Sequence, residues 1–404
     1  MVTNVQLQCC NLHAQFCMAH TLLFYILISL PFFCASQKLA LLPFEQLYGG
    51  VIIVKATLDA KPNDTLNFVL DTGSSHISLD STTVSNLGLV AVPSSNEIRG
   101  IGGLKKVSQC LNQTLTIAGL KLTNIAFNVN DYTIIAESSG VHIDGILGFA
   151  FISKYILEVN YDSSVITIHG LNPIKYPRRG YTLPFTLNYL PKLTLKVSEQ
   201  KKHTIPLYID CGAGISMLYS EKMVSDSAFF AKGKKKLTVL IEGMGGITST
   251  QLTTTKVVNI GPYKFKQVPT YVYNDKHDVL RYPYSSGLLG NDILRRFNWI
   301  LNYNTQELHL MPNSNYYENF DYSYTGLSIY YKDKAIIVVD IADSSPAQLA
   351  GFEIGDIIIG INKTFVTTLK QAKDLLQTTN RNLQVIILRN NAPQNITLRP
   401  LSIR

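Results

Sequence analysis

The sequence has little cysteine, which excludes a fold held together by disulfides. Six cysteines occur in 404 residues, and four of them lie within the first 36 residues: Cys9, Cys10, Cys17 and Cys34. Only Cys110 and Cys211 remain in the rest of the chain. A small fold stabilised by several disulfide pairs is therefore not expected, which is compatible with export without requiring it.

Long apolar runs are also missing. Residues 22–33 (LLFYILISLPFF) form a run of 12 residues, which is shorter than the roughly 20 residues of a membrane-spanning helix. The small residues at 34–36 suit a signal-peptidase cut near Ser36, so residues 1–36 are interpreted as a leader to a secreted or periplasmic location. No Lys or Arg precedes the run, so either Met18 is the true start or the leader is retained as a membrane anchor.

Charge is sparse and spread along the chain. Charged residues make up 16% of the sequence against 46% hydrophobic residues, which favours folded material. The net charge is +8, but its one tight cluster, residues 232–236, lies in a polar loop, and no recognition module is present. Nucleic acid is therefore not an expected partner. A chain of 404 residues is too long for one core and predicts two or three domains.

The hydrophobic pattern has mostly a period of two, with glycine and asparagine at the breaks, which predicts a body rich in β-strands. The expected strands are residues 51–59, 66–71, 110–119, 164–170, 193–197 and 205–210. Short helices are expected at residues 151–157, 220–230, 291–297 and 369–378.

Four sequence blocks occur twice in the same order. The first copy reads FVLDTGSS (68–75), RGIGG (99–103), DGILGFAFISKY (144–155) and VNYDSSVITIH (159–169); the second reads YIDCGAGI (208–215), EGMGG (242–246), SGLLGNDILRRF (286–297) and LNYNTQELHL (301–310). The aspartate precedes the Gly-Gly pair by 31 and 35 residues, and the apolar-apolar-Gly block by 75 and 78 residues. The chain therefore contains two copies of one β unit, each with one Asp-x-Gly turn.

This duplication would bring two aspartates, Asp71 and Asp210, to one place. Two carboxylates at about 3 Å cannot both ionise, so one acts as the base that activates water and the other as the acid that protonates a substrate carbonyl. The glycine after each aspartate lets backbone approach closely and lets amide hydrogens point at the carboxylate. The strands that end in ILG (146–148) and LLG (288–290) are expected to pack beneath the turns. If the aspartates do not face each other, Asp210 is only a turn residue.

The motifs DTGS (71–74) and DCGA (210–213), with their downstream ILG and LLG blocks, resemble the paired signature of the aspartic peptidases over residues 44–313. The resemblance implies a mainly β fold with a bilobal β-barrel body, lobe 1 at residues 37–170 and lobe 2 at 171–313. It implies that Asp71 and Asp210 form a catalytic dyad that activates water, with no covalent intermediate, no cofactor and no metal. The implied partner is a polypeptide substrate lying across the cleft.

Other residues receive roles from the same resemblance. Thr72 would cross between the lobes to opposing backbone, Ser74 would hydrogen-bond the outer oxygen of Asp71, and Cys211, in place of the expected Thr, would weaken one inter-lobe hydrogen bond by about 1 kcal/mol. His76 is interpreted as a neighbour without a chemical role. The supporting residues are Thr72, Gly73, Ser74, Cys211, Gly212 and Ala213. The tips that would close over a substrate, or else form ordinary hairpin turns, are Gly100, Ile101, Gly102, Gly103, Gly243, Met244, Gly245 and Gly246.

Residues 314–404 are assigned to a C-terminal domain that begins in a Tyr- and Asn-rich linker, residues 313–322, and the segment after this linker resembles a PDZ domain, a small α+β fold. The motifs that carry this resemblance are SPAQLAG (345–351), the Gly-Asp pair at 355–356 and the run up to residue 362. The resemblance implies a groove in which backbone amides bind a peptide's terminal carboxylate and the peptide adds as a strand. The implied peptide-binding residues are Gly326, Leu327, Ser328, Ile329 and Thr368. Alternatively, the domain only stabilises or caps the body.

These features predict a secreted or periplasmic aspartic endopeptidase whose PDZ domain binds a substrate or a regulatory C-terminal peptide. Membrane attachment is expected only if the leader is retained. The alternative is a non-catalytic peptide-binding protein that keeps both the cleft and the PDZ groove.

Overall fold

The computed structural model describes residues 37–188 and 190–404, and residues 38–171 and 176–404 form one compact unit. The leader expected at residues 1–36 lies outside the described residues. In the described part of the chain, no helix has the length and apolarity to cross a membrane. The mainly β fold expected from the sequence is confirmed.

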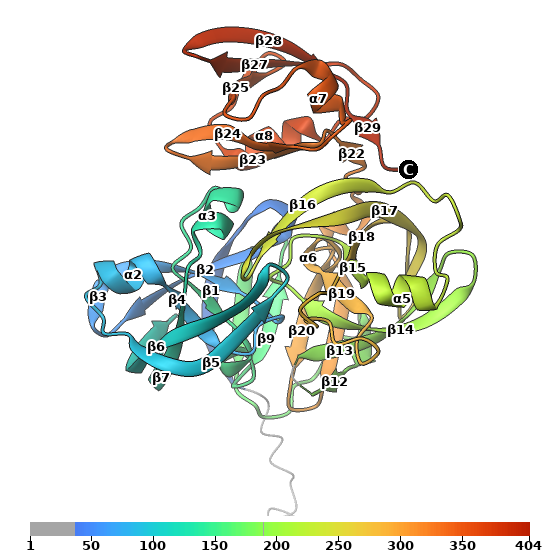
Figure 1. Ribbon diagram of the computed structural model, residues 1–404. Helices are drawn as coiled ribbons and strands as arrows, with labels where there is room; N and C mark the ends of the chain where they lie inside the picture. Colours follow the sequence, from blue (N-terminus) through green and yellow to red (C-terminus); the bar gives the residue numbers. More distant parts are fainter. Residues whose placement is uncertain (1–36, 189) are drawn as a thin grey trace, which may run out of the picture. The chain divides into compact units, whose positions relative to one another are not determined.

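Lobe 1 is a curved sheet in which the strands follow the order β2-β3-β8-β4-β7-β6-β5, closed by an extra pairing of β2 with β6 (Figure 1). Its strands are β2 (Ile52–Leu58), β3 (Lys61–Leu70), β4 (Ile77–Asp80), β5 (Val92–Gly100), β6 (Gly103–Ile117), β7 (Leu120–Asn130) and β8 (Gly145–Leu147). Its helical segments are η1 (Tyr48–Gly50), α2 (Ser81–Asn86), α3 (Thr133–Ser139) and α4 (Phe149–Ile152).

Lobe 2 repeats this order strand by strand as β13-β14-β19-β15-β18-β17-β16, and β13 pairs with β17 as β2 pairs with β6. Its strands are β13 (Pro191–Ser198), β14 (Lys202–Asp210), β15 (Met217–Ser220), β16 (Leu237–Gly243), β17 (Gly246–Ile260), β18 (Tyr263–Tyr273) and β19 (Gly287–Gly290). Its helices are α5 (Glu221–Asp226) and α6 (Asn291–Leu294). The internal repeat in the sequence is thus a repeat of topology.

A shared layer of strands joins the two lobes. Its order is β11-β21-β20-β9-β10-β1, and the antiparallel pair of β9 with β20 lies at its centre. Its strands are β1 (Lys38–Gln46), β9 (Ile156–Asn160), β10 (Val165–His169), β11 (Tyr181–Pro184), β20 (Phe297–Asn302) and β21 (Glu307–Pro312); the short β12 (Thr186–Leu187) pairs with β13. One buried apolar cluster runs through both lobes and this layer, so the body has a continuous core.

The helices differ from the sequence prediction in extent and number. The prediction of a helix at residues 151–157 is wrong beyond Ile152, because residues 156–160 form β9 and pair with both β10 and β20. Such tertiary pairing outweighs local helix propensity. Helix α2 was not predicted, although the Asp80 carboxylate caps it by accepting hydrogen bonds from Thr82 N and Thr83 N. Helix α3 was not predicted either.

The C-terminal domain, residues 323–404, has a sheet and an apolar core of its own. Strand β23 forms one edge of the sheet order β23-β24-β25-β27-β28. The strands of the domain are β22 (Ser323–Tyr324), β23 (Leu327–Lys332), β24 (Ala335–Ile341), β25 (Ile357–Ile361), β26 (Thr364–Phe365), β27 (Leu383–Arg389), β28 (Ala392–Leu398) and β29 (Leu401–Ser402). Strands β22 and β29 pair with each other outside this sheet. The helices of the domain are α7 (Pro346–Ala350) and α8 (Leu369–Leu376), and the segment before it contains η2 (Ser314–Tyr317).

Candidate active site

The two aspartates occupy equivalent positions at the ends of equivalent strands. Asp71 directly follows β3, which runs parallel to β8, and Asp210 ends β14, which runs parallel to β19. The Asp71 amide donates to Leu147 O at 3.0 Å, and Asp210 is the register partner of Gly290. The apolar-apolar-Gly blocks therefore lie beside the two turns, as the sequence spacing predicted.

The glycines of the two turns bring each aspartate against the opposite lobe. A Cβ atom built on Gly73 would lie 2.7 Å from Cγ of Asp210, and one on Gly212 would lie 2.5 Å from Cγ of Asp71. No side chain fits in either gap, which is why both turns carry glycine. The two carboxyl groups are close enough to share a hydrogen bond.

The electrostatic settings of the two carboxyl groups differ. Burial, followed by the neighbouring Asp210 carboxylate, raises the pKa of Asp71 well above its usual value. Burial also raises the pKa of Asp210, but backbone amides oppose this shift by stabilising the charged form. Asp210 Oδ1 accepts from Gly212 N at 3.0 Å and Ala213 N at 2.9 Å, whereas Asp71 Oδ1 accepts from Gly73 N at 2.7 Å. We therefore assign the shared proton to Asp71 and the negative charge to Asp210.

Thr72 and Cys211 hold the turns together by crossed hydrogen bonds. Thr72 Oγ1 donates to Ile209 O at 2.8 Å and accepts from Cys211 N at 3.0 Å. In the mirror arrangement, Cys211 Sγ donates to Leu70 O at 3.3 Å and accepts from Thr72 N at 3.4 Å. The thiol therefore keeps both bonds that a threonine hydroxyl would make. Burial raises the pKa of Cys211 to about 12, so the group stays a neutral donor.

Two expectations for the residues after Asp71 have different outcomes. Ser74 Oγ donates to His76 O at 3.3 Å, so the expected bond to the outer oxygen of Asp71 is not the one that forms. The serine hydroxyl instead bonds to the backbone of its own turn, two residues further along the chain, as serines in turns commonly do. The His76 side chain is exposed and pairs with Ser75 Oγ at 2.7 Å, away from the dyad.

The two glycine-rich tips meet each other over the site. The hairpins β5–β6 and β16–β17 turn at residues 100–103 and 243–246. Gly102 N donates to Met244 O at 3.0 Å, and Tyr273 OH donates to Ile101 O at 2.8 Å. Met244 O would lie 2.0 Å from a Cβ on Gly100, so glycine is required for this approach. Gly103, Gly245 and Gly246 shape the tips by their positive φ angles.

A cavity of about 870 Å³ contains both aspartates and the tips Gly100, Ile101, Gly243 and Met244 in its wall. Apolar side chains line it beside each aspartate. On the Asp71 side they are Val51, Val69, Tyr132, Ile143 and Ile146, and on the Asp210 side Tyr208, Leu218, Ile241, Leu280 and Leu288. The sequence did not identify them as cavity-lining residues, although Ile146 and Leu288 belong to the ILG and LLG blocks that were expected beside the turns. Strand alternation alone places Val69 and Tyr208 on the same face as the aspartate two positions later.

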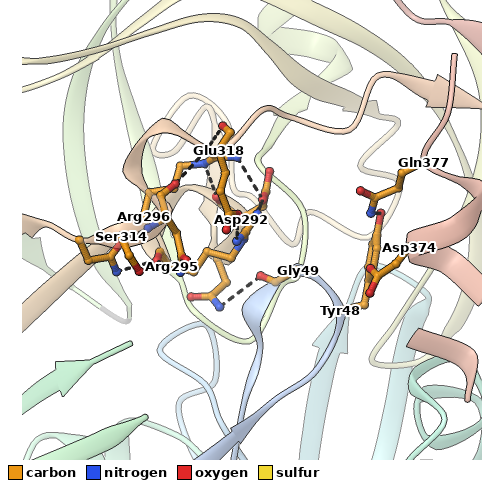
Figure 2. A network of polar contacts seen from close by, with 12 residues as sticks. Tyr48, Gly49, Asp292, Arg295, Arg296, Ser314, Glu318, Asp374 and Gln377 are labelled. Atoms are coloured by element: carbon orange, nitrogen blue, oxygen red, sulfur yellow. Dashed lines mark hydrogen bonds and ion pairs between the residues drawn. The ribbon is translucent and has the colours of Figure 1, made fainter. Parts of the chain in front are cut away.

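A polar network ties lobe 2 to the segment that leads to the C-terminal domain (Figure 2). Arg295 NH1 lies 2.6 Å from Glu318 Oε2, and Arg295 Nε donates to Asp292 Oδ1 at 3.0 Å. In the same view, Tyr48 lies beside Gln377, and its OH accepts from Gln377 Nε2 at 3.2 Å. Tyr48 OH also donates to Asp321 Oδ2 at 3.2 Å. The segment between the body and the C-terminal domain is thus fixed at several points.

The residues expected to bind a peptide in the C-terminal domain divide into two groups. Leu327, Ser328 and Ile329 lie on β23 and line the cavity, and Gly326 forms the turn before it with φ +77°. Thr368 does not line the cavity, because its hydroxyl caps α8 by accepting from Gln371 N at 3.2 Å. The helix contributes instead Lys370, Lys373, Asp374 and Leu376, which sequence reasoning missed.

Comparisons with known proteins match two parts of the chain. A family model described as Aspartyl protease matches residues 54–151, and a model described as PDZ domain matches residues 337–389. No curated protein matches the chain. Within residues 37–188 and 190–404, no three His, Cys, Asp or Glu side chains are grouped to hold a metal ion.

Proposed function

Because the chain contains an aspartyl-protease-like domain and a PDZ domain, we propose that it is an aspartic endopeptidase that hydrolyses extended polypeptides. The observation that carries this proposal is the approach of Asp71 and Asp210 from two equivalent turns, with each glycine packed against the opposite carboxyl group. Such a pair holds one proton and one charge, which is what acid and base catalysis by two carboxyl groups requires.

In the proposed reaction, the Asp210 carboxylate takes a proton from a water molecule while the water oxygen attacks the peptide carbonyl carbon. The Asp71 carboxylic acid donates its proton to the carbonyl oxygen, which gives a neutral tetrahedral diol. The diol then returns a hydroxyl proton to Asp71, the proton on Asp210 moves to the leaving nitrogen, and the C–N bond breaks. The products are a carboxylic acid and an amine, and the dyad regains its first protonation state.

The proposed substrate has apolar side chains on both sides of the cut. Apolar groups line the cavity next to Asp71 and next to Asp210, and burial of such side chains against substrate favours binding. The tips at Ile101 and Met244 would have to part to admit an extended chain, since Gly102 N and Met244 O are hydrogen-bonded.

Cleavage of a peptide library by the wild type, Asp71→Asn and Asp210→Asn tests the proposal. We expect either substitution to lower kcat by at least about a thousandfold, because each removes one partner of the acid–base pair. Lys363→Met, an exposed change in the turn between β25 and β26, is the control and should leave cleavage unchanged. Cleavage that persists in both asparagine variants contradicts the dyad, and a wild type that binds peptides without cutting any of them supports the alternative of a peptide-binding protein.

We also propose export of the protein through the leader at residues 1–36, on the grounds of its apolar run and the small residues near Ser36. Cell fractionation combined with sequencing of the mature N-terminus tests this. A mature chain that begins near Gln37 outside the cytoplasm supports secretion, and an intact leader in the membrane fraction supports the anchored form. Full-length protein in the cytoplasm refutes export.

A further inference from the structure

The cavity that holds the two aspartates also extends along the C-terminal domain. Its wall includes Leu327, Ser328, Ile329 and Tyr330 of β23, together with Lys370, Lys373, Asp374, Leu376 and Gln377 on and just after α8. These are the two sides of the groove between β23 and α8. The groove and the dyad therefore open into one continuous space of about 870 Å³, within the range of ligand sites that bury most of a bound molecule.

Strand β23 can accept an added strand along this space. It pairs with β24 on one side and forms the edge of its sheet in the described part of the chain. The turn before it is held by Ala342 N, which donates to Gly326 O at 2.8 Å, and by Leu327 N, which donates to Thr325 Oγ1 at 3.1 Å. An extended polypeptide that adds to such an edge gains backbone hydrogen bonds that do not depend on its side chains.

A partly buried cation lies on the helix side of the groove. Lys373 Nζ donates to Ser138 O at 2.8 Å and lies 5.4 Å from the ring of Tyr48. No carboxylate of the described residues forms an ion pair with it, whereas its neighbour Lys370 pairs with Asp374 at 2.6 Å. Burial lowers the pKa of Lys373, and the Glu242 carboxylate, which already accepts from Tyr330 OH, opposes this shift without forming an ion pair with the ammonium group. A ligand carboxylate would supply a paired counter-charge.

The far end of the groove is closed by lobe 1. Helix α3 packs against β23, and a Cβ on Gly140, the residue after α3, would lie 2.9 Å from Leu369 Cβ of α8 and 3.6 Å from Tyr331 Cβ of β23. On the same strand, Tyr330 OH donates to Glu242 Oε1 of lobe 2 at 2.8 Å. A chain that lies along β23 from the turn at Gly326 therefore meets α3 beyond Tyr330. The open direction is the cavity that contains Asp71 and Asp210.

From this arrangement we propose that the protein cuts polypeptides at a short, fixed distance from their free C-terminus. The last residues of the substrate add to β23, the terminal carboxylate pairs with the partly buried ammonium of Lys373, and the chain turns into the cleft, where the scissile bond meets the dyad. The substrate class is thus a polypeptide with an accessible, unmodified C-terminus. This inference rests on the proposed peptidase function and adds a rule for where the cut falls.

A peptide series tests the rule directly. A sequence that the wild type cleaves is placed about 2 to about 12 residues from the C-terminus, a spacer of about 7 to about 40 Å at 3.3 Å per residue. Each peptide is made as the free acid and as the C-terminal amide. We expect one optimal spacer length and, at that length, a kcat/KM at least about tenfold higher for the acid than for the amide, the effect of one charge-assisted contact.

Substitution of the cation separates its role from general damage. Lys373→Met should remove the preference for the free acid, so that the ratio of kcat/KM for acid over amide falls to about one, while Lys363→Met should keep the wild-type ratio. Thermal melting of both variants checks the fold. Binding is measured separately with inactive Asp71→Asn protein and a fluorescein-labelled peptide of optimal length, and the free acid should bind at least about tenfold more tightly than the amide.

The outcomes separate this inference from the function on which it rests. Cleavage that is indifferent to the terminal group and to spacer length refutes the C-terminal rule and leaves the peptidase function standing. Equal binding of acid and amide by Asp71→Asn protein refutes the rule even without any cleavage data. Failure to cut any peptide, together with preferential binding of the free acid, refutes the peptidase function and keeps the groove as a C-terminus receptor.

Discussion

The turn after β3 and the turn at the end of β14 carry different side chains on matching backbones: Thr72 and Ser74 in the first, Cys211 and Ala213 in the second. The exchange of Thr for Cys changes little, because the thiol makes the same donor and acceptor contacts as the hydroxyl. The backbone makes the larger difference. Two amides point at Asp210 and one at Asp71, so nearly symmetric lobes hold an asymmetric pair of acids.

The largest loss of activity should come from substitutions that fill the gap between the Asp71 turn and the Asp210 turn. Gly73→Ala and Gly212→Ala each place a methyl group within 3 Å of the opposite carboxyl carbon. We expect each to lower kcat at least about a hundredfold by misplacing the dyad and to destabilise the fold by about 1–3 kcal/mol through overpacking.

Gly233→Ala is the control for these substitutions, since its Cβ would have no atom within 4 Å although its φ is +82°. It should show only the strain of that backbone angle, about 1 kcal/mol, with normal kcat. Equal kcat in all three variants would mean that the two turns are further apart than described.

At positions 72 and 211, a hydroxyl or a thiol should support the crossed hydrogen bonds, whereas an aliphatic side chain should not. Thr72→Val and Cys211→Val keep the shape and remove the donor, so buried Ile209 O or Leu70 O loses its partner at about 1–3 kcal/mol. Cys211→Thr should preserve or raise both stability and activity. Urea unfolding and kcat measure these effects, and a loss of activity in Cys211→Thr would show that this turn has been misinterpreted.

The different pKa settings of Asp71 and Asp210 should give the two asparagine variants different pH profiles of stability. The folded pKa of Asp71 is raised, so its contribution is complete below the ordinary pKa of 3.8 and is lost as the pH rises through the folded value. Asp71→Asn cannot titrate and should gain stability over the wild type towards neutral pH, with a larger gain than Asp210→Asn, whose carboxylate is stabilised by two amides.

Thermal melting of the wild type and both asparagine variants from about pH 3 to about pH 7 gives this comparison. The melting temperatures should converge at the acid end. A larger gain for Asp210→Asn would reverse the assignment of proton and charge.

The smallest effects should come from substitutions of Ser74 and Ala213, the last residues of the DTGS and DCGA motifs. Ser74 Oγ bonds only to backbone of its own turn, at 3.3 Å. Ser74→Ala and Ala213→Ser should therefore change stability by less than about 0.5 kcal/mol and leave the pH profile of kcat in place. A shift of that profile in Ser74→Ala would indicate that Ser74 reaches Asp71 during the reaction.

The sequence predicted the parts of the body that depend on local spacing. Two Asp-x-Gly turns and two apolar-apolar-Gly blocks at matching intervals were enough to expect paired turns with a strand beside each, and the topology repeats accordingly. The predicted helix at residues 151–157 was wrong beyond Ile152, because residues 156–160 form β9. The pairing of β9 with β20 is a contact between the two halves of the chain, which no local pattern encodes.

The residues that line the groove between β23 and α8 were harder to predict from the sequence. Leu327 to Ile329 followed from the motif, but Lys373 and Leu376 did not, because helical phase decides which side of α8 meets the cavity. Thr368 was assigned to the ligand and instead caps the helix, a role that the same residue type fills at many helix starts. The closure of the groove by α3 depends on contacts between residues about 230 positions apart.

The crossed hydrogen bonds of Thr72 and Cys211 also bear on when the site is completed during synthesis of the chain. The Thr72 hydroxyl bonds to Ile209 O on β14 and to Cys211 N in the turn after it, and Leu70 O accepts from the Cys211 thiol. During synthesis, lobe 1 is complete well before Cys211 has been added, so for that interval the chain has one aspartate and an unfinished turn. Under the proposed peptidase function, half of the chain therefore has no hydrolytic activity, and a new chain gains that activity only when the second half has folded.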